Sequence, residues 1–115
     1  ALKECHITLN KNGIPFDPES PMITSGLRIG AAAVTSLGMG QDEMRELADI
    51  IDAVLRGTRR GTVESGKNAG KPSKINYEID PNVKEAATAR VKTLLDRFPV
   101  YPELDADFLA RHFAA

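Results

Sequence analysis

Apolar residues recur at helical spacing in the middle of the chain. Side chains at positions i, i+3, i+4 and i+7 share one face of a helix, so this spacing predicts an amphipathic helix over residues 42–55. The residues that carry the spacing are Met44, Leu47, Ile51 and Val54. Either Gly40 or Gln41 is predicted to cap the helix, and Asp42 and Glu43 follow in its first turn, where the helix dipole favours negative charge.

A second helix is predicted to begin at Pro81. Asp80 precedes it as a capping residue, and proline suits the first helical position because its missing N–H would have no partner there. Pro99 ends the pattern. The apolar side consists of Val83, Ala87, Val91, Leu94, Leu95 and Phe98. A short third helix is predicted from Glu103 to His112, with the side chains turned inward being Leu104, Phe108 and Leu109.

The first thirty residues have the pattern of strands joined by a stiff loop. Residues 5–9 alternate weakly between apolar and polar and lead into a turn at Asn12 and Gly13, which predicts a strand. Three prolines then fix backbone angles over residues 12–22, which predicts an irregular loop. A strand resumes over residues 22–29, and residues 31–35 fit either strand or coil. We expect the two predicted helices to cover one face of a small sheet.

As a whole, residues 57–79 show neither the apolar spacing of a helix nor the alternation of a strand. Four glycines punctuate this segment, and from Arg56 to Lys74 six basic residues stand against one acidic residue, Glu64. Such a basic loop could contact RNA or a phosphate group, but it has no interleaved aromatic residues and no nucleic-acid motif. The favoured interpretation is a polar, solvated insertion loop.

Within the second predicted strand, Arg28 lies between Gly26 and Gly30. Alternate residues of a strand share a face, so the guanidinium is predicted to stand over a surface without neighbouring side chains, while Leu27 and Ile29 face a core. Glycine inside a strand often marks the close approach of a ligand or another backbone, and the planar fork of arginine suits a carboxylate or phosphate. On spacing alone, a solvated arginine on an edge strand remains the alternative.

The composition narrows the classes of function. The chain has 115 residues, of which 42% are hydrophobic, enough for one small domain with a modest core. Its 15 basic and 16 acidic residues leave a net charge of −1, which argues against nucleic-acid or membrane partners.

A single cysteine, Cys5, excludes an internal disulfide. The sequence has no signal-peptide or membrane-spanning run, so a cytoplasmic location is expected. His6 and His112 belong to no cluster with metal-ligand spacing, so no metal site is expected.

Several short motifs occur in an order that is typical of one enzyme family. They are Asn10-Lys11-Asn12-Gly13, Ser20-Pro21-Met22, Thr24-Ser25-Gly26-Leu27-Arg28-Ile29-Gly30, Ala33-Val34-Thr35 with Gly38, Gln41-Asp42-Glu43-Met44-Arg45-Glu46 and Arg97-Phe98-Pro99-Val100-Tyr101-Pro102. Together they resemble the C-terminal small domain of serine hydroxymethyltransferase. The family commonly has Thr-Pro at Ala31 and Ala32 and an arginine at Leu37, so the chain departs from its pattern at those positions.

The resemblance implies roles for particular residues. Arg28 matches the arginine that binds the α-carboxylate of serine or glycine bonded to pyridoxal phosphate in this family. Asn12, which by itself would be interpreted as a turn residue, matches an asparagine near the pterin of tetrahydrofolate. The segment that lines the folate site in the family is matched by Ser20, Pro21 and Met22.

The resemblance also implies a fold and an activity. Residues 1–115 are expected to be the α/β small C-terminal domain of a pyridoxal-phosphate fold-type I enzyme, with a small sheet covered by two main helices. A missing large domain is expected to supply the lysine that bonds the cofactor, so this fragment alone is expected to be inactive. The full-length enzyme is expected to interconvert serine and glycine with tetrahydrofolate, as a homodimer or homotetramer.

Two other functions stay open at this stage. A stand-alone, non-catalytic domain could bind a carboxylate ligand through Arg28 or associate with another protein through its surface. A related aldolase acting on other β-hydroxy amino acids is disfavoured by the match to the folate segment.

Overall fold

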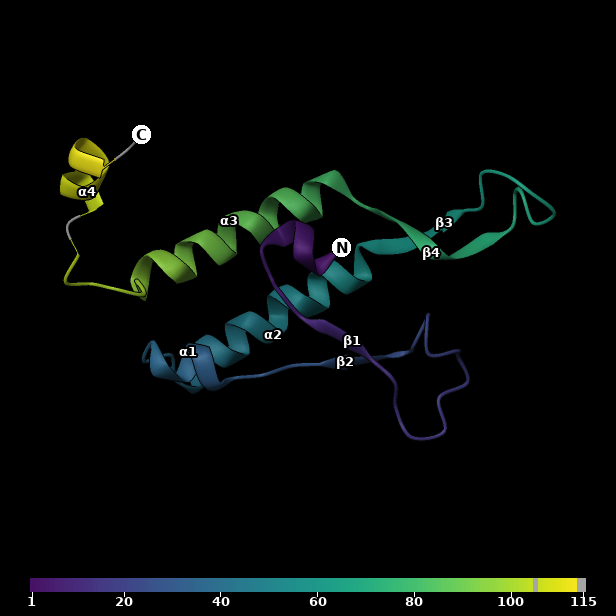
Figure 1. The fold of residues 1–115 in the computed structure, drawn as a ribbon, viewed down its shortest axis with the longest axis horizontal. Coiled ribbons are helices and arrows are strands. Elements are labelled where there is room, and N and C mark those ends of the chain that lie inside the picture. Colours follow the sequence, from purple (N-terminus) through teal and green to yellow (C-terminus); the bar gives the residue numbers. More distant parts are fainter. Residues whose placement is uncertain (105, 114–115) are drawn as a thin grey trace.

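The computed structural model describes residues 1–104 and 106–113 and has the predicted α/β class. Figure 1 shows two long helices side by side, with a β-ribbon beside them, a hairpin beyond one end and a short helix beyond the other. In chain order, the elements are the 3₁₀-helix η1 (Leu2–Cys5), β1 (Asn10–Asn12), β2 (Gly26–Arg28), α1 (Ala32–Ser36), α2 (Gln41–Arg56), β3 (Thr58–Thr62), β4 (Pro72–Ile79), α3 (Pro81–Arg97) and α4 (Ala106–Phe113).

The two long helices, α2 and α3, form where the sequence predicts them. Gly40 is the N-cap of α2, and its N–H donates to the Glu43 carboxylate over 2.9 Å. Asp80 caps α3 by accepting a hydrogen bond from the Asn82 N–H over 2.8 Å, with Pro81 in the first helical position. Each start therefore satisfies an amide that has no partner within the helix.

The hydrophobic core lies where α2 and α3 pack on η1. Its completely buried side chains are Cys5, Ile50 and Val54, and around them lie Leu2, Ile7, Ala87 and Val91. Two ion pairs connect the helices beside this core, Arg90 with Glu46 at 2.9 Å and Arg97 with Glu43 at 2.8 Å. The core is small, so most of the chain's apolar residues lie outside it.

The start of the chain differs from the prediction of a strand over residues 5–9. Leu2 and Cys5, three positions apart, are both buried because the 3₁₀ turn aligns side chains at i and i+3. His6, with φ of 62°, ends the turn in the left-handed region. The strand begins only at Asn10, since a short apolar run does not distinguish a strand from a helical turn.

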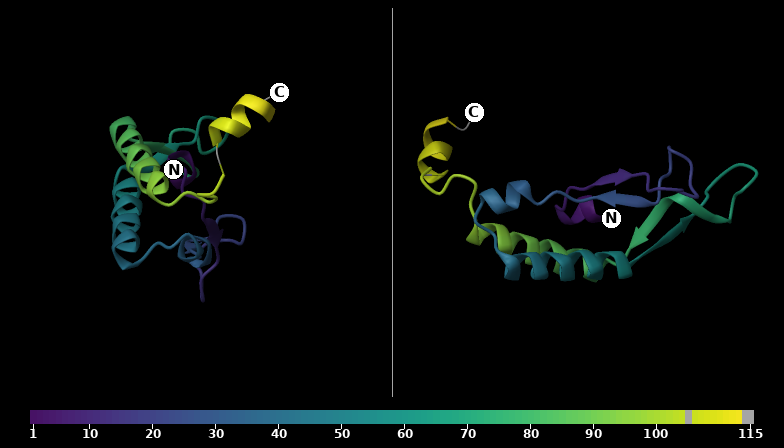
Figure 2. Two further views of the ribbon diagram at one scale, coloured as in Figure 1. Left: turned by 90° about the vertical axis from the view of Figure 1, so that its left-hand side faces the viewer. Right: turned by 90° about the horizontal axis from the view of Figure 1, so that it is seen from below.

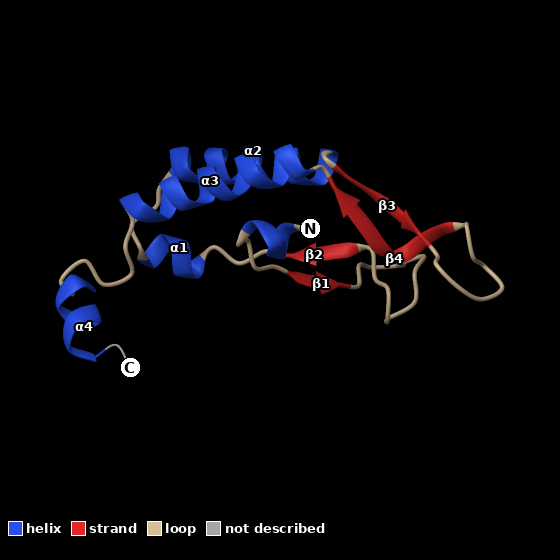
Figure 3. Cartoon of the chain, turned by 90° about the horizontal axis from the view of Figure 1, so that it is seen from above, coloured by secondary structure: helices blue, strands red, loops and turns tan. Residues whose placement is uncertain are grey.

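The four strands of the described residues form two separate ribbons rather than one small sheet. β1 pairs with β2 and β3 pairs with β4, both antiparallel. Figure 3 shows the helix pair as one layer, with the β1–β2 ribbon in a second layer below it. β2 is shorter than the predicted strand because residues 20–24 turn, with Thr24 at φ of 56°. The prediction of strand or coil for residues 31–35 was wrong, because residues 32–35 lie in the short helix α1.

Residues 57–79, predicted as a polar loop, form the β3–β4 hairpin with a connecting tip at residues 63–71. Arg59 and Glu78 are paired across the strands, and their side chains form an ion pair at 2.9 Å. Only Gly61 and Ser73 are buried in the two strands. The prediction of a loop was wrong because this ribbon is exposed on both faces and its β3 strand lacks apolar alternation.

The molecule is more extended than a single domain of this length. Its radius of gyration is 18.1 Å, against about 13 Å for a compact domain of 115 residues. Figure 2 shows the hairpin and the C-terminal helix reaching away from the centre.

The expectation that Leu27 and Ile29 face a core is wrong for this chain, because these side chains are 49% and 58% exposed.

The C-terminal helix begins three residues later than predicted, at Ala106. Phe108 stacks on the ring of His112 with 4.2 Å between centroids. Leu104 and Phe108, predicted to turn inward, remain about half exposed, whereas the side chain of Leu109 lies outside the described part of the structure.

Candidate functional site

The register of the β1–β2 ribbon brings Arg28, the predicted substrate residue, and Asn12, one of the predicted folate residues, to one face. Asn10 pairs with Arg28 and Asn12 pairs with Gly26. Because residues two apart in a strand share a face, Asn12 and Arg28 lie on the same side of the ribbon. Lys11 and Leu27 form the pair between them and lie on the opposite side. Two residues sixteen positions apart are thus held close by backbone pairing alone.

Arg28 presents a free cation on this face. Its side chain is exposed, and the part of the chain that the structure describes offers it neither a hydrogen-bond nor an ion-pair partner. Five guanidinium donors therefore remain available to a planar anion.

The two glycines on either side of Arg28, Gly26 and Gly30, differ in the space around them. A Cβ at Gly26 would lie 2.7 Å from the Asn12 carbonyl oxygen, so the space there is taken by the opposite strand of the same chain. A Cβ at Gly30 would meet no atom within 4 Å. The open surface predicted around Arg28 therefore exists on the Gly30 side only.

The loop between β1 and β2 is organised by Asp17. Its Oδ1 accepts from the Ser25 hydroxyl at 2.6 Å and from the Glu19 N–H at 2.9 Å, and its Oδ2 accepts from the N–H groups of Ser25 and Ile14. The Ser25 hydroxyl, followed by these backbone donors, lowers the pKa of the Asp17 carboxyl to about 2. Asp17 is therefore ionised at neutral pH and closes the loop onto the start of β2.

A hollow of about 360 Å³ opens beside the ribbon in this loop. It is lined by Lys11, Asn12, Gly13, Asp17, Glu19, Ser20, Pro21 and Thr24. The structure thus brings Asn12, Ser20 and Pro21 together around one space. Arg28 does not line the hollow and lies two positions farther along β2 than Gly26, the partner of Asn12.

Met22 belongs to this region through its backbone rather than its side chain. Its carbonyl oxygen accepts a hydrogen bond from Lys11 Nζ over 2.8 Å, whereas its side chain is 80% exposed and does not line the hollow. The adjacent turn is closed by the Ser20 carbonyl, which accepts from the N–H groups of Ile23 and Thr24.

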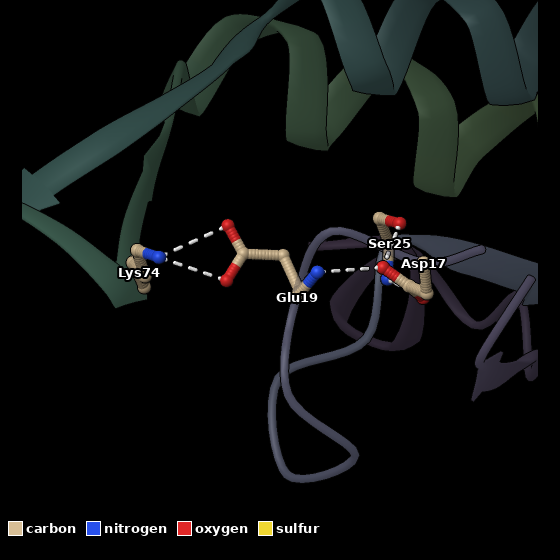
Figure 4. A network of polar contacts seen from close by, with 4 residues as sticks. All are labelled: Asp17, Glu19, Ser25 and Lys74. Carbon is tan, nitrogen blue, oxygen red and sulfur yellow. Dashed lines mark hydrogen bonds and ion pairs between the residues drawn. The ribbon is translucent and has the colours of Figure 1, made fainter.

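Four residues of this region were missed by the sequence analysis: Lys11, Asp17, Glu19 and Ser25. Figure 4 shows how Asp17 binds Glu19 and Ser25, and how Glu19 reaches Lys74 of the hairpin. An available signal was Asp17 followed by Pro18, because an aspartate before proline often organises a turn with its carboxylate. Lys74 had no such signal, since the ion pair joins residues 55 positions apart.

Two kinds of site are absent from the part of the chain that the structure describes. No group of three or more His, Cys, Asp or Glu residues there could hold a metal ion. Among residues 1–104 and 106–113, no helix has the length and apolar character needed to span a membrane.

Comparison with known proteins gives one consistent result. The family model for serine hydroxymethyltransferase matches residues 1–51, which include every candidate site residue. The chain is 45% identical over 113 residues to the serine hydroxymethyltransferase of Treponema pallidum, a match that covers 98% of the chain. The chain belongs to the serine hydroxymethyltransferase family. The serine hydroxymethyltransferase of Chlamydia felis is 46% identical to it over 109 residues, or 94% of the chain.

The chain corresponds to a C-terminal part of these serine hydroxymethyltransferases and spans only about a fifth of their length. The match covers 19% of the Treponema pallidum protein and 21% of the Chlamydia felis protein. No solved structure matches the chain.

Proposed function

We propose that this chain is the C-terminal domain of an enzyme that interconverts serine and glycine with tetrahydrofolate. In this proposal, Arg28 binds the substrate carboxylate, and Asn12, Ser20, Pro21 and Met22 form part of the folate site. The observation that carries the proposal is the free guanidinium of Arg28 on the same ribbon face as Asn12, which lines one hollow together with Ser20 and Pro21.

Arg28 would act by orientation as well as attraction. Two parallel hydrogen bonds from the guanidinium fix the plane of a carboxylate, which a single ammonium does not. With the carboxylate fixed, the amino acid is held so that one particular bond at Cα would stand perpendicular to the pyridine ring of the cofactor. Pyridoxal phosphate, when bound, supplies the electron sink for that bond. Arg28 therefore determines which bond reacts.

The residues of this chain fit the amino acid better than they fit the cofactor itself. Lys11, the lysine that lines the hollow, donates its Nζ to the Met22 carbonyl at 2.8 Å and is occupied there. Family resemblance, rather than this contact, assigns the cofactor lysine to the large domain, and the isolated chain is proposed to be inactive. A cytoplasmic location and a homodimeric or homotetrameric assembly remain predictions.

Exposed apolar side chains support contact with that larger domain or with a second subunit. Between residues 14 and 29 these are Ile14, Phe16, Met22, Leu27 and Ile29, all at least 48% exposed. Several large apolar side chains exposed within one short segment are typical of a region that another protein surface covers. We propose that the large domain covers it in the full-length enzyme.

The test is kinetic and uses the full-length protein. Serine should be converted to glycine only when tetrahydrofolate is present. Asn12→Ala should raise the KM for tetrahydrofolate about tenfold, because the loss of one hydrogen bond to the folate would cost about 1.4 kcal/mol. Asn82→Ala, a control in the first turn of α3, should leave this KM unchanged. Absence of turnover together with carboxylate binding would favour the non-catalytic alternative.

A further inference from the structure

The β3–β4 hairpin contacts the candidate folate loop through one ion pair. Lys74 Nζ donates to both carboxylate oxygens of Glu19, at 2.8 and 3.1 Å. The Glu19 side chain is 25% exposed and that of Lys74 is 58% exposed, so the acidic partner is partly sheltered from solvent. Figure 4 shows Lys74 approaching from the hairpin strand toward the loop.

Glu19 lies next to the residues that we assign to the folate site. Its own N–H is held by Asp17, and Ser20 follows it directly in the chain. The other contacts that shape this loop are local: Asp17 with Ser25, and Lys11 with the Met22 carbonyl. The Lys74 ion pair differs because it ties the loop to an element outside the ribbon.

The hairpin in turn is anchored to the helical core. At its base, the Asp80 N–H donates to the Gly57 carbonyl over 2.9 Å, where α2 and α3 connect to the two strands. On β4, the Tyr77 hydroxyl donates to the Glu4 carboxylate at 2.6 Å, which joins the hairpin to η1. Lys74 therefore connects the folate loop to the best-packed part of the chain.

We propose that the β3–β4 hairpin positions the tetrahydrofolate loop, with Lys74 as the positioning residue that acts through Glu19. This inference rests on the proposed function. Lys74 need not contact folate: it limits the positions that the segment from Ser20 to Met22 adopts. Its loss would lower the affinity for tetrahydrofolate without changing the binding of serine.

The experiment reverses one charge at a time in the full-length enzyme. Lys74→Glu places two carboxylates together and should raise the KM for tetrahydrofolate about fivefold, the scale expected for a partly exposed pair. The kcat and the KM for serine should stay within about twofold of the wild type. The double variant Glu19→Lys with Lys74→Glu should restore the KM, because it rebuilds the pair in the opposite sense.

Lys67→Glu is the matched control. Lys67 lies in the tip of the same hairpin, is exposed, and has no hydrogen-bond or ion-pair partner in the described part of the chain. Lys67→Glu changes the net charge by the same amount as Lys74→Glu, so the KM of this variant for tetrahydrofolate should equal that of the wild type. An unchanged KM in Lys74→Glu, a rise equal to that of Lys67→Glu, or no recovery in the double variant would overturn the proposal.

Amide hydrogen exchange separates this proposal from the proposed function. In Lys74→Glu, amides of residues 13–25 should exchange faster than in the wild type and in Lys67→Glu. If the wild-type protein shows no tetrahydrofolate-dependent turnover, the proposed function fails, and the exchange rates alone decide whether the hairpin positions the loop. Equal exchange in all three proteins would contradict the positioning role.

Discussion

The α2–α3 pair and the β1–β2 ribbon use their apolar residues in opposite ways. The helices bury Ile50, Val54, Ala87 and Val91 against each other and η1. The ribbon and its loop leave apolar side chains such as Phe16, at 102%, open to solvent. The helices thus contain the core of the chain, whereas the ribbon leaves apolar side chains exposed, as expected of the contact surface proposed above.

The arginines of the two regions also differ: those of α3 are paired, and that of β2 is exposed without a partner among the described residues. Arg90 and Arg97 of α3 are paired with glutamates of α2. Arg28 of β2 has no partner in the described residues. A paired arginine stabilises its surroundings, whereas an unpaired one keeps its donors available for a ligand. In this account the helix pair is the scaffold and the ribbon is the proposed binding surface. The first two changes below test that division, and the third tests the hairpin.

The largest expected effect on stability comes from shortening one isoleucine in each region. Ile50→Ala should lower the free energy of unfolding of the isolated chain by about 2–5 kcal/mol, because Ile50 is completely buried. Ile29→Ala makes the same chemical change where the side chain is 58% exposed, so it should cost less than about 1 kcal/mol. Chemical denaturation followed by circular dichroism measures both. Equal losses would remove the distinction between scaffold and surface.

A smaller, local effect should follow acidification of the loop. The pKa of Asp17 is lowered from 3.8 to about 2, so its ionised form stabilises the folded loop above pH 4. This stabilisation should fade as the pH falls from 4 toward 2, while α2 and α3 remain folded. NMR signals of the Ser25 amide should report the change, and Asp17→Asn should show the acid form of these signals already at pH 6. A Ser25 amide that is insensitive to pH and to Asp17→Asn would refute the role of Asp17.

The smallest effect concerns the hairpin tip, which should be the first site of proteolysis. Trypsin should cut after Lys67, because residues 63–71 lie outside both strands. Lys71 precedes Pro72 and is therefore a poor site, whereas Arg59 and Arg60 lie within β3. Mass spectrometry of a short digest identifies the first fragments, and Lys67→Gln should remove them. Initial cleavage at Arg59 or Arg60 would show that β3 opens before the tip.

The scaffold was predictable from the sequence because its signals are local. Gly40, Asp80 and Pro81 lie within three residues of the helix ends that they define, and apolar spacing identifies the buried faces. The α/β class was predictable as well, whereas the roles of Arg28 and Asn12, implied by the family resemblance, stay predictions. The ribbon register then added that both residues lie on one face.

The parts that could not be predicted depend on contacts between distant residues. Lys74 meets Glu19 only after the hairpin and the ribbon have formed. The hairpin itself had one signal, the alternation of Ile75, Tyr77 and Ile79, which the surrounding glycines and charges obscured. The match to the Treponema pallidum protein covers 98% of the chain and so extends across this hairpin.

The role of Arg28 is tested most directly by Arg28→Lys in the full-length enzyme. Lysine keeps the positive charge but loses the planar fork, so one charge-assisted hydrogen bond and the orientation of the carboxylate are lost. The kcat/KM for serine should fall at least about 100-fold, while the pyridoxal phosphate content, measured in parallel, stays normal. Arg60→Lys, at an exposed arginine of β3 without a partner among the described residues, should leave both quantities unchanged. Near-normal serine turnover in a fully loaded Arg28→Lys enzyme would contradict the account and reduce Arg28 to a solvated arginine on an edge strand.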